Sequence, residues 1–352
     1  SGRPVITNSI GFEDKEFNEL GAASAIARHL GTEHHEFMVE PRATEVLEKI
    51  AWHLDEPLAD SSAIPTWYVC EMARRNVTVA LSGDGGDEAF GGYTFRYVPH
   101  MLESRLRAGL PALLRGPLFG ALGALWPASA LLPQPLRLKT IFENLAVSDA
   151  EAYYRDLVWL RSEARAALYT PAFNSELRGY TPREAVLPFY TGSDARTPLA
   201  RSQYADINFY MTDDVLVKAD RMSMAHSLEM RCPLLDYRLI EFGTRLPDDL
   251  KVRGRSGKVV LRELAARRLP AEIRNLPKRG FSIPAAKWLR GELRPMAESL
   301  LFDAQRPFGG VLDERVVKSM WDEHVSAKRD HSVFLWGLMM LSLWRRQSAL
   351  AA

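Results

Sequence analysis

The first hundred residues alternate between short apolar runs and segments in which apolar side chains recur at helical spacing. The short runs are rich in β-branched and aromatic residues, and they predict strands at residues 5–12, 35–39 and 77–81. The segments with helical spacing predict helices at residues 18–30, 44–54 and 65–75. The resulting order of strands and helices predicts an α/β fold, in which helices cover a parallel sheet.

After about residue 100 the strand pattern disappears and helical spacing takes over. Helices are expected at residues 102–132, 149–168, 198–216, 216–230, 258–269 and 333–345. We therefore divide the chain into an α/β nucleotide-binding layer at residues 1–98 and a mainly helical part of the same domain at residues 99–352. Neither an internal repeat nor a low-complexity segment interrupts this pattern.

The most apolar stretch, residues 118–132, contains Gly120, Gly123 and Pro127. It is shorter than the ~20 apolar residues that a membrane-spanning helix needs, so no membrane span is expected. We expect a buried or surface-docked helical hairpin here, with peripheral membrane contact as the alternative.

The charge balance argues against nucleic acid or another extended polyanion as the partner. Lys and Arg total 45 and Asp and Glu total 44, so nothing favours binding to nucleic acid. Cys70 and Cys232 are too few for a disulfide framework, and both lie in apolar runs. We expect buried thiols and a cytoplasmic location.

The most informative segment is residues 82–88, SGDGGDE, directly after the apolar run that ends at residue 81. Its glycines let a ligand approach the backbone, and ligands of open α/β sheets bind where parallel strands end. Asp84, Asp87 and Glu88 would repel a phosphate unless a cation lay between them, which points to Mg²⁺. The alternative is a tight turn whose acidic side chains lie on the surface.

Residues 81–93, LSGDGGDEAFGGY, resemble the second signature of asparagine synthetases and of the related β-lactam-forming synthetases. Other segments resemble the family in the same order along the chain. They are residues 9–20 (SIGFEDKEFNEL), 30–37 (LGTEHHEF), 55–67 (DEPLADSSAIPTW), 213–236 (DDVLVKADRMSMAHSLEMRCPLLD), 256–270 (SGKVVLRELAARRLP) and 277–289 (PKRGFSIPAAKWL). The resemblance spans about residues 5–345.

The resemblance implies a sheet of the adenine-nucleotide α-hydrolase type, the fold of PP-loop ATP pyrophosphatases. It also implies a two-step reaction that uses ATP and Mg²⁺. ATP activates a carboxylate, usually the aspartate side chain, as an acyl-adenylate and releases pyrophosphate; ammonia then displaces AMP and leaves an amide. Segment 177–200 and the C-terminal helices could admit a larger acid than aspartate.

The resemblance also assigns residues to the nucleotide. The implied ATP contacts are Ile10, Gly11, Ser82, Gly83 and Gly85. Ile10 would equally suit the core of a strand, and the two interpretations are compatible.

Three charged residues carry the implied chemistry. Asp87 matches the acid that holds Mg²⁺ against the pyrophosphate. Asp84 stands where relatives carry Glu or Tyr, and it would position ammonia or take its proton. Lys258 is expected in a helix, one turn before Arg262, with its ammonium group at the α-phosphate; the alternative is a solvated helix lysine.

The family's active-site cleft is lined by the helix that contains Lys218, Asp220 and Arg221, with Glu229 further along. The alternative for these four residues is an internal ion-pair network that ties the helical part to the sheet. Tyr93 either caps the pocket or packs in the interior.

Two expected parts of the family do not occur in the sequence: the first signature, SGG-x-DSS, and the glutaminase domain. We expect both upstream in a longer protein, and little ATP turnover from this chain alone. Without the strand that precedes these residues in the family, the sheet would expose an apolar flank. That flank would permit self-association, for example as a homodimer. The competing hypotheses are an inactive scaffold copy of the family and another enzyme with the same nucleotide-binding fold.

Overall fold

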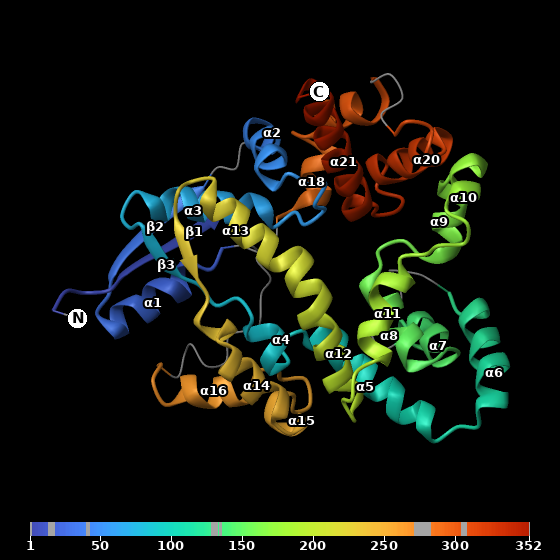
Figure 1. The fold of residues 1–352 in the computed structure, drawn as a ribbon, viewed down its shortest axis with the longest axis horizontal. Helices are drawn as coiled ribbons and strands as arrows, with labels where there is room; N and C mark the ends of the chain where they lie inside the picture. The colour runs from blue at the N-terminus through green and yellow to red at the C-terminus, as the bar shows by residue number, and fades with distance from the viewer. Residues whose placement is uncertain are drawn as a thin grey trace.

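The computed structural model describes residues 2–12, 18–39, 43–127, 133, 136–270, 283–303 and 308–351. Parts of three expected features lie outside these residues: 13–17 and 277–282, within two of the segments that resemble the family, and 128–132, at the end of an expected helix. Figure 1 shows the N-terminal strands and their helices on one side of the molecule and a helical part on the other.

The N-terminal layer begins with a parallel strand pair joined by a helix. Strands β1 (Ile6–Phe12) and β2 (Glu33–Val39) pair in parallel, with Ile6 opposite Glu33 and Phe12 opposite Val39. Helix α1 (Leu20–Leu30) connects them and ends at Gly31, whose φ of 65° is the left-handed conformation that glycine adopts without steric cost. The predicted strand–helix–strand unit is confirmed here.

A second parallel pair joins distant parts of the chain. Helices α2 (Ala43–Leu54) and α3 (Ala63–Arg74) lead to β3 (Val79–Leu81), which pairs with β4 (Glu229–Arg231). The expectation that no strand follows residue 100, with helix as far as residue 230, is wrong. Helix α13 (Leu216–Met224) ends earlier because Ser227 takes a left-handed φ of 54°, which turns the chain into β4.

Strand β3 is shorter and more exposed than the buried strand expected at residues 77–81. It has three residues, and Val79 and Leu81 are 41% and 73% exposed. The reason is the narrow sheet: among the described residues, β3 belongs to a two-stranded sheet whose other strand is β4. An apolar flank is therefore present at these two side chains. The mixed α/β fold is confirmed, with small parallel sheets in place of one continuous layer.

The middle of the chain is helical and more divided than expected. Its helices are α4 (Gly86–Phe90), α5 (Thr94–Ala108), α6 (Ala112–Leu125), α7 (Lys139–Leu145), α8 (Asp149–Leu157), α9 (Ser162–Leu168), α10 (Pro171–Glu176) and α11 (Arg183–Thr191). The single helix expected at residues 102–132 is broken between α5 and α6, where Pro111 takes a non-helical ψ of 132°. The segment 177–200 contains α11. Helix α6 is surface-docked, since Leu113 is 90% exposed.

One long rod crosses the centre of Figure 1. It consists of α12 (Pro198–Ala205), the π-helix η2 (Asp206–Val215) and α13. The remaining elements follow in order: η3 (Pro233–Leu235), α14 (Tyr237–Arg245), α15 (Asp248–Lys251), α16 (Val259–Ala266), α18 (Ala285–Arg290), α19 (Arg294–Glu298), η4 (Ser299–Asp303), α20 (Glu314–Val325) and α21 (Ser332–Ala351).

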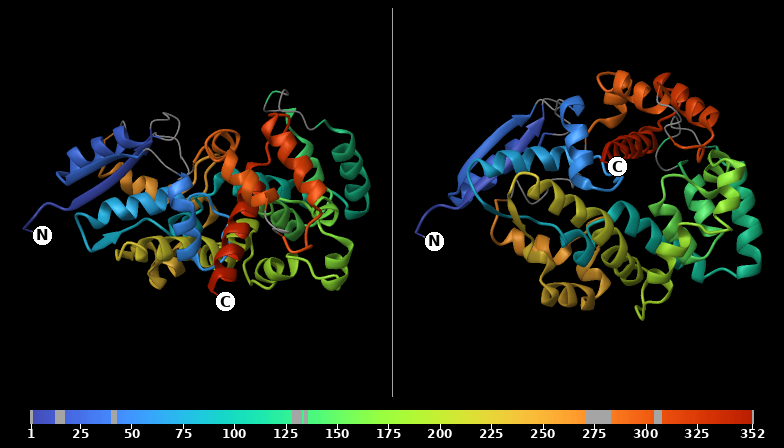
Figure 2. Two further views of the ribbon diagram at one scale, coloured as in Figure 1. Left: turned by 90° about the horizontal axis from the view of Figure 1, so that it is seen from above. Right: turned by 45° about the horizontal axis from the view of Figure 1, so that its top comes forward.

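The largest apolar core joins the two ends of the chain. Leu47 and Ile50 of α2 belong to the same buried cluster as Trp321 of α20 and Trp336 of α21. Figure 2 shows α21 beside the N-terminal helices. The boundary near residue 98, between the α/β layer and the helical part of the same domain, remains a prediction. Within the part of the chain that the structure describes, no helix is both long enough and apolar enough to cross a membrane.

Candidate functional site

The glycine-rich loop (residues 82–92, including α4) starts where β3 ends and is held against the segment that follows β4. The Ser82 amide donates to the Arg231 carbonyl at 2.9 Å. Gly85 has a φ of 86°, and a Cβ there would lie 2.2 Å from Leu235 Cδ2. Both facts require glycine at residue 85. Gly83, in contrast, faces open space, since a Cβ there would meet nothing within 4 Å.

The structure brings Lys258 to Asp87. Lys258 Nζ lies 3.0 Å from Asp87 Oδ2, and the two side chains are 30% and 26% exposed. Both therefore remain accessible to a ligand. Gly92 lies directly beside them: a Cβ there would be 1.7 Å from Asp87 Oδ1 and 2.5 Å from Lys258 Cε.

The backbone around Lys258 corrects one expectation. Lys258 does not lie within a helix but caps the start of α16, with a left-handed φ of 52°. Its amide donates to the Phe90 carbonyl at 3.2 Å. Gly257 permits this approach, since a Cβ there would lie 2.4 Å from the Gly91 carbonyl oxygen. The lysine is thus fixed to the end of α4 by its own backbone.

Asp84 is held by the first residue of the loop. The Ser82 hydroxyl donates to Asp84 Oδ2 at 2.6 Å, and it also lies 3.2 Å from Cys232 Sγ. Cys232 is only half-buried, so the expectation of a buried thiol is confirmed for Cys70 alone. Burial raises the pKa of Cys70 to about 12, which keeps it a thiol.

Tyr93 is packed and hydrogen-bonded beneath the loop. Its hydroxyl donates to Glu88 Oε1 at 2.5 Å, and its ring lies 5.7 Å from that of Tyr210. Burial raises the pKa of the Glu88 carboxyl and that of the Tyr93 hydroxyl. The Arg96 guanidinium lies 4.9 Å from the Tyr93 ring centre. The interior packing expected as one of the two roles of Tyr93 is present.

The cleft residues of α13 separate into two environments. Lys218 Nζ lies 2.6 Å from Asp60 Oδ2 and 2.7 Å from Ser62 Oγ, so it ties the rod to the start of α3. Asp220 and Arg221 are exposed. Glu229, on β4, is exposed too and pairs with Arg231 at 2.7 Å. Only Lys218 forms the expected link to the N-terminal layer.

Asp214 stands beside this link. Burial and then the charge of Asp60 raise the pKa of Asp214 to about 7. Burial also opposes ionisation of Asp60, but the ion pair with Lys218 lowers its pKa overall. Asp60 thus carries the negative charge that pairs with Lys218, while its neighbour Asp214 resists ionisation.

Ile10 and Gly11 lie in the other sheet. Ile10 is buried with Phe12 and Val39, which confirms the core role given as its alternative. A Cβ at Gly11 would lie 2.4 Å from Leu20 Cδ1, so the strand and α1 approach closely there.

A buried network behind the site was not expected from the sequence. Asp206 is fully buried and accepts from Arg96 at 2.6 Å, from Tyr97 at 2.5 Å and from Tyr153 at 2.7 Å. Helical spacing placed Asp206 in a helix but could not show that it points inward. The network fixes α5 and α8 to the rod.

A second missed group supports α4. The Gln203 amide donates to the carbonyls of Glu88 and Ala89, at 2.7 and 3.0 Å, and accepts from the buried Lys251 at 3.0 Å. Hollows of about 730 and 470 Å³ lie elsewhere, along α20 and between α9 and α21.

Comparison with known proteins gives one consistent result. The family model described as asparagine synthase matches residues 1–346. Asparagine synthetase [glutamine-hydrolyzing] 1 of Bacillus subtilis is 31% identical over 96% of this chain and 51% of that protein. A putative asparagine synthetase [glutamine-hydrolyzing] of Mycobacterium bovis is 35% identical over 97% of this chain and 50% of its own length. Amidase chry2 of Gibberella zeae is 25% identical, over 87% and 48%. The chain spans about half the length of these curated relatives.

Proposed function

The chain belongs to the asparagine synthase family, and from this membership we propose that it catalyses ATP-dependent amide formation on a carboxylate. The carboxylate, for which aspartate is the proposed acceptor, is first adenylated and pyrophosphate leaves. Ammonia then attacks the acyl carbon, AMP leaves with the bonding electron pair, and the ammonium proton passes to a base. The product is asparagine or a related amide.

The activation step is needed for a chemical reason. Hydroxide is a poor leaving group, so ammonia does not displace it from a carboxylate in water. Adenylation replaces it with AMP, a far better leaving group. Exclusion of water then matters because water would hydrolyse the acyl-adenylate.

The observation that carries the proposal is the Lys258–Asp87 pair on the glycine-rich loop, with Nζ and Oδ2 3.0 Å apart. An accessible ammonium group held by its own backbone is suited to negative charge that develops on a departing pyrophosphate. Removal of such a group typically lowers kcat by ~10²–10³. Ser82, Gly83 and Gly85 would contact the nucleotide through the loop backbone.

The residues present fit a magnesium ion at Asp87. Its carboxylate is partly exposed, and the glycine at residue 92 lets Oδ1 approach the backbone where a Cβ would otherwise stand. Carboxylate oxygens are the ligands that Mg²⁺ prefers. Bound there with ATP, the ion would screen the charge of the phosphates, and Lys258 would be released from Asp87 to the nucleotide.

Asp84 is the proposed base or ammonia-positioning group. The Ser82 hydroxyl holds its Oδ2, at 2.6 Å, which leaves Oδ1 to face an incoming amine. Since the names of the matched synthetases include glutamine hydrolysis, we propose glutamine as the source of ammonia in the protein that the complete gene encodes.

The test is exchange of labelled pyrophosphate into ATP, run on this chain and on the protein that the complete gene encodes. Aspartate is supplied, omitted or replaced by a panel of other acids, and glutamine is compared with ammonium salts. Exchange that requires aspartate supports asparagine formation, and exchange only with another acid identifies a different acceptor. No exchange from either protein with any acid contradicts the proposal and favours a scaffold.

Lys258→Met sharpens the test, because methionine keeps the aliphatic length and removes the charge. We expect ~10²–10³ lower exchange and a nearly unchanged Tm, since exposed ion pairs contribute about 0–1 kcal/mol. Lys318→Met is the matched control, because Lys318 forms an exposed pair with Asp322 at 2.8 Å on α20. If Lys258→Met exchanged pyrophosphate as fast as the unchanged chain, Lys258 would have no part in the mechanism.

A further inference from the structure

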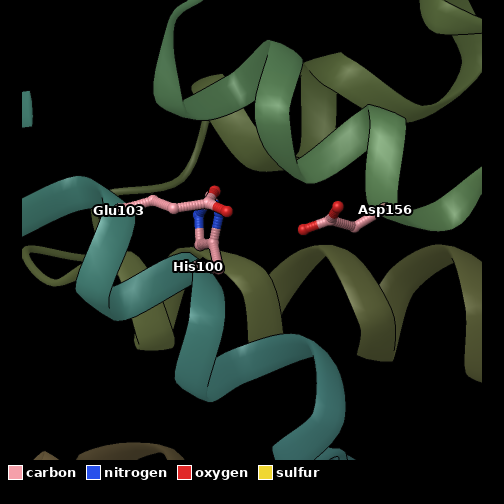
Figure 3. A group of neighbouring side chains, drawn as sticks. All are labelled: His100, Glu103 and Asp156. Carbon is pink, nitrogen blue, oxygen red and sulfur yellow. The ribbon is translucent and has the colours of Figure 1, made fainter. Parts of the chain in front are cut away.

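Three titratable side chains converge between α5 and α8 in the helical part. His100 and Glu103 are three residues apart on α5, so they share a face of that helix, and Asp156 approaches from α8. One donor atom from each lies within 4.8 Å of the other two. Figure 3 shows the imidazole and both carboxylates pointing toward one another. His100 is 1% and Glu103 2% exposed.

Two of the buried atoms in this cluster lack a hydrogen bond. Among the described residues, neither His100 Nδ1 nor Glu103 Oε2 has a hydrogen-bond partner. A buried polar atom without a partner costs about 1–3 kcal/mol. His100 Nε2 lies 2.8 Å from the Tyr190 hydroxyl. When Nε2 donates its hydrogen to that hydroxyl, Nδ1 carries a lone pair.

The two nitrogens of the His100 ring have different surroundings. Nε2 is engaged by the Tyr190 hydroxyl, and the buried Nδ1 faces the cluster without a partner among the described residues. A hydrogen bond from the remote ring nitrogen is the arrangement that commonly orients a metal-bound histidine. Tyr190 would have this role here.

The carboxylates around the cluster exceed the cations available to them. Arg107 lies 3.7 Å from Glu103 Oε2 and also pairs with Asp149. Asn144 donates to Glu103 at 3.3 Å and to Asp156 at 3.0 Å, but it is uncharged. Three carboxylates thus surround one guanidinium.

Two further guanidiniums of this region are paired with carboxylates outside the cluster. Arg96 pairs with Asp206 at 2.6 Å and Arg161 with Glu143 at 2.6 Å. The cluster thus brings two carboxylates to one imidazole, and Glu103 Oε2 is buried without a hydrogen bond among the described residues.

We propose that His100, Glu103 and Asp156 form a binding site for a divalent transition-metal ion, with Zn²⁺ as the best match. One imidazole and two carboxylates with a fourth position for water are a typical zinc donor set. Zinc ligands about 2 Å from the ion lie roughly 3.3 Å apart, so small side-chain rotations complete the site. The ion would cross-link α5 to α8. This site is separate from Asp87 and does not depend on the proposed reaction.

The test uses the full chain, freed of metal with a chelator and titrated with Zn²⁺ against a chromophoric competitor. We expect one zinc ion per chain at this site and a higher Tm when it is bound. Glu103→Gln and His100→Gln should each weaken zinc binding at least 10-fold, because each removes one ligand. His29→Gln, a change of an exposed histidine on α1, and Asp87→Asn should leave the site intact.

Equal zinc binding by the unchanged chain and by Glu103→Gln would overturn the proposal and leave a shared proton as the balancing charge. X-ray absorption of the zinc-loaded chain gives a second readout that needs no variant. Nitrogen and oxygen ligands without sulfur support the site. Sulfur ligation would place the ion at Cys70 or Cys232 and overturn it.

Discussion

Gly92 lies where any side chain would collide with the two charged groups of the candidate site. Its Cβ would lie 1.7 Å from Asp87 Oδ1 and 2.5 Å from Lys258 Cε. Its amide also donates to the Asp87 carbonyl at 2.7 Å. Both colliding atoms belong to the far ends of flexible side chains, so an added methyl group would displace the charges and leave the backbone in place.

Gly92→Ala is therefore expected to lower activity more than stability. A displacement of about 1 Å in a reacting group can cost ~10² in rate, whereas the side-chain shift should cost about 1 kcal/mol or less. Pyrophosphate exchange and thermal unfolding measure the two effects. Gly21→Ala is the control: a Cβ there meets nothing within 4 Å, and in helix α1 it should stabilise by ~0.5–1 kcal/mol. Parallel losses of folding and activity would contradict this interpretation.

At this scale, the sequence predicted which side chains would meet but not how they are held. The proximity of Lys258 to the glycine-rich loop followed from resemblance to a family. The left-handed backbone of Lys258 did not, because it depends on a hydrogen bond to Phe90, a residue far away in the sequence. Asp206 was missed for a similar reason: spacing assigns a position to a helix, and only packing decides whether its carboxylate is buried.

At the scale of elements, the rod is joined to α3 by one compact charged group. Lys218 bridges Asp60 and Ser62, and Asp214 lies one turn earlier on η2. The protonated Asp214 carboxyl can donate to Asp60, and both Asp60 and burial raise its pKa to about 7. The junction therefore contains a group that titrates in the neutral range.

Asp214→Asn should change how stability depends on pH. The unfolded chain loses the Asp214 proton near pH 3.8 and the folded chain near pH 7, so between these values the folded state binds more protons. Its stability must then fall as pH rises. Asparagine donates like the protonated acid and never ionises. The variant should match the unchanged chain near pH 4 and exceed it by about 1–3 kcal/mol at pH 8.

Urea unfolding at several pH values measures this difference. Asp213→Asn, a change of the exposed neighbour, should leave the pH dependence as it was. A constant difference between Asp214→Asn and the unchanged chain from pH 4 to pH 8 would show that Asp214 is ionised in the folded state throughout.

The elements that the sequence predicted well are those with local causes. Helix α2 agrees with the apolar pattern because it buries a periodic face, and strands β1 and β2 fall within or around the predicted segments because they pair with each other through one short connection. β4 was missed because its three residues gain their strand conformation from β3, some 150 positions earlier. The π-helix η2 was missed because its wider turns leave the apolar spacing nearly unchanged.

On the scale of the whole molecule, one buried cluster holds the N-terminal layer against the C-terminal helices. Leu47 is fully buried in α2, in the same cluster as Leu335 and Trp336 of α21. The glycine-rich loop lies between these regions in the sequence. If they share one core, the site keeps its geometry only while both are folded.

Leu47→Ala tests whether that core makes the chain a single cooperative unit. Removing a fully buried leucine side chain should cost about 2–5 kcal/mol, the sum of lost apolar burial and the cavity left behind. In a background where Trp52 of α2 and Trp67 of α3 are replaced by phenylalanine, the remaining tryptophans lie in the helical part. Fluorescence then reports on that part, which includes Trp321 and Trp336, each 1% exposed, while far-UV circular dichroism reports on all helices. Leu113→Ala, at a leucine that is 90% exposed, should change stability by less than about 0.5 kcal/mol.

In a cooperative chain, Leu47→Ala in this background moves both urea transitions by the same amount, although the substitution is in the N-terminal layer and the remaining fluorescent reporters are in the helical part. If the α/β layer and the helical part unfolded independently, circular dichroism would shift in part and fluorescence would stay in place. That result would separate the two parts energetically. Substitutions in the C-terminal helices would then not destabilise the site at Lys258 and Asp87 through the shared core. A joint shift instead implies that such substitutions destabilise the site as well.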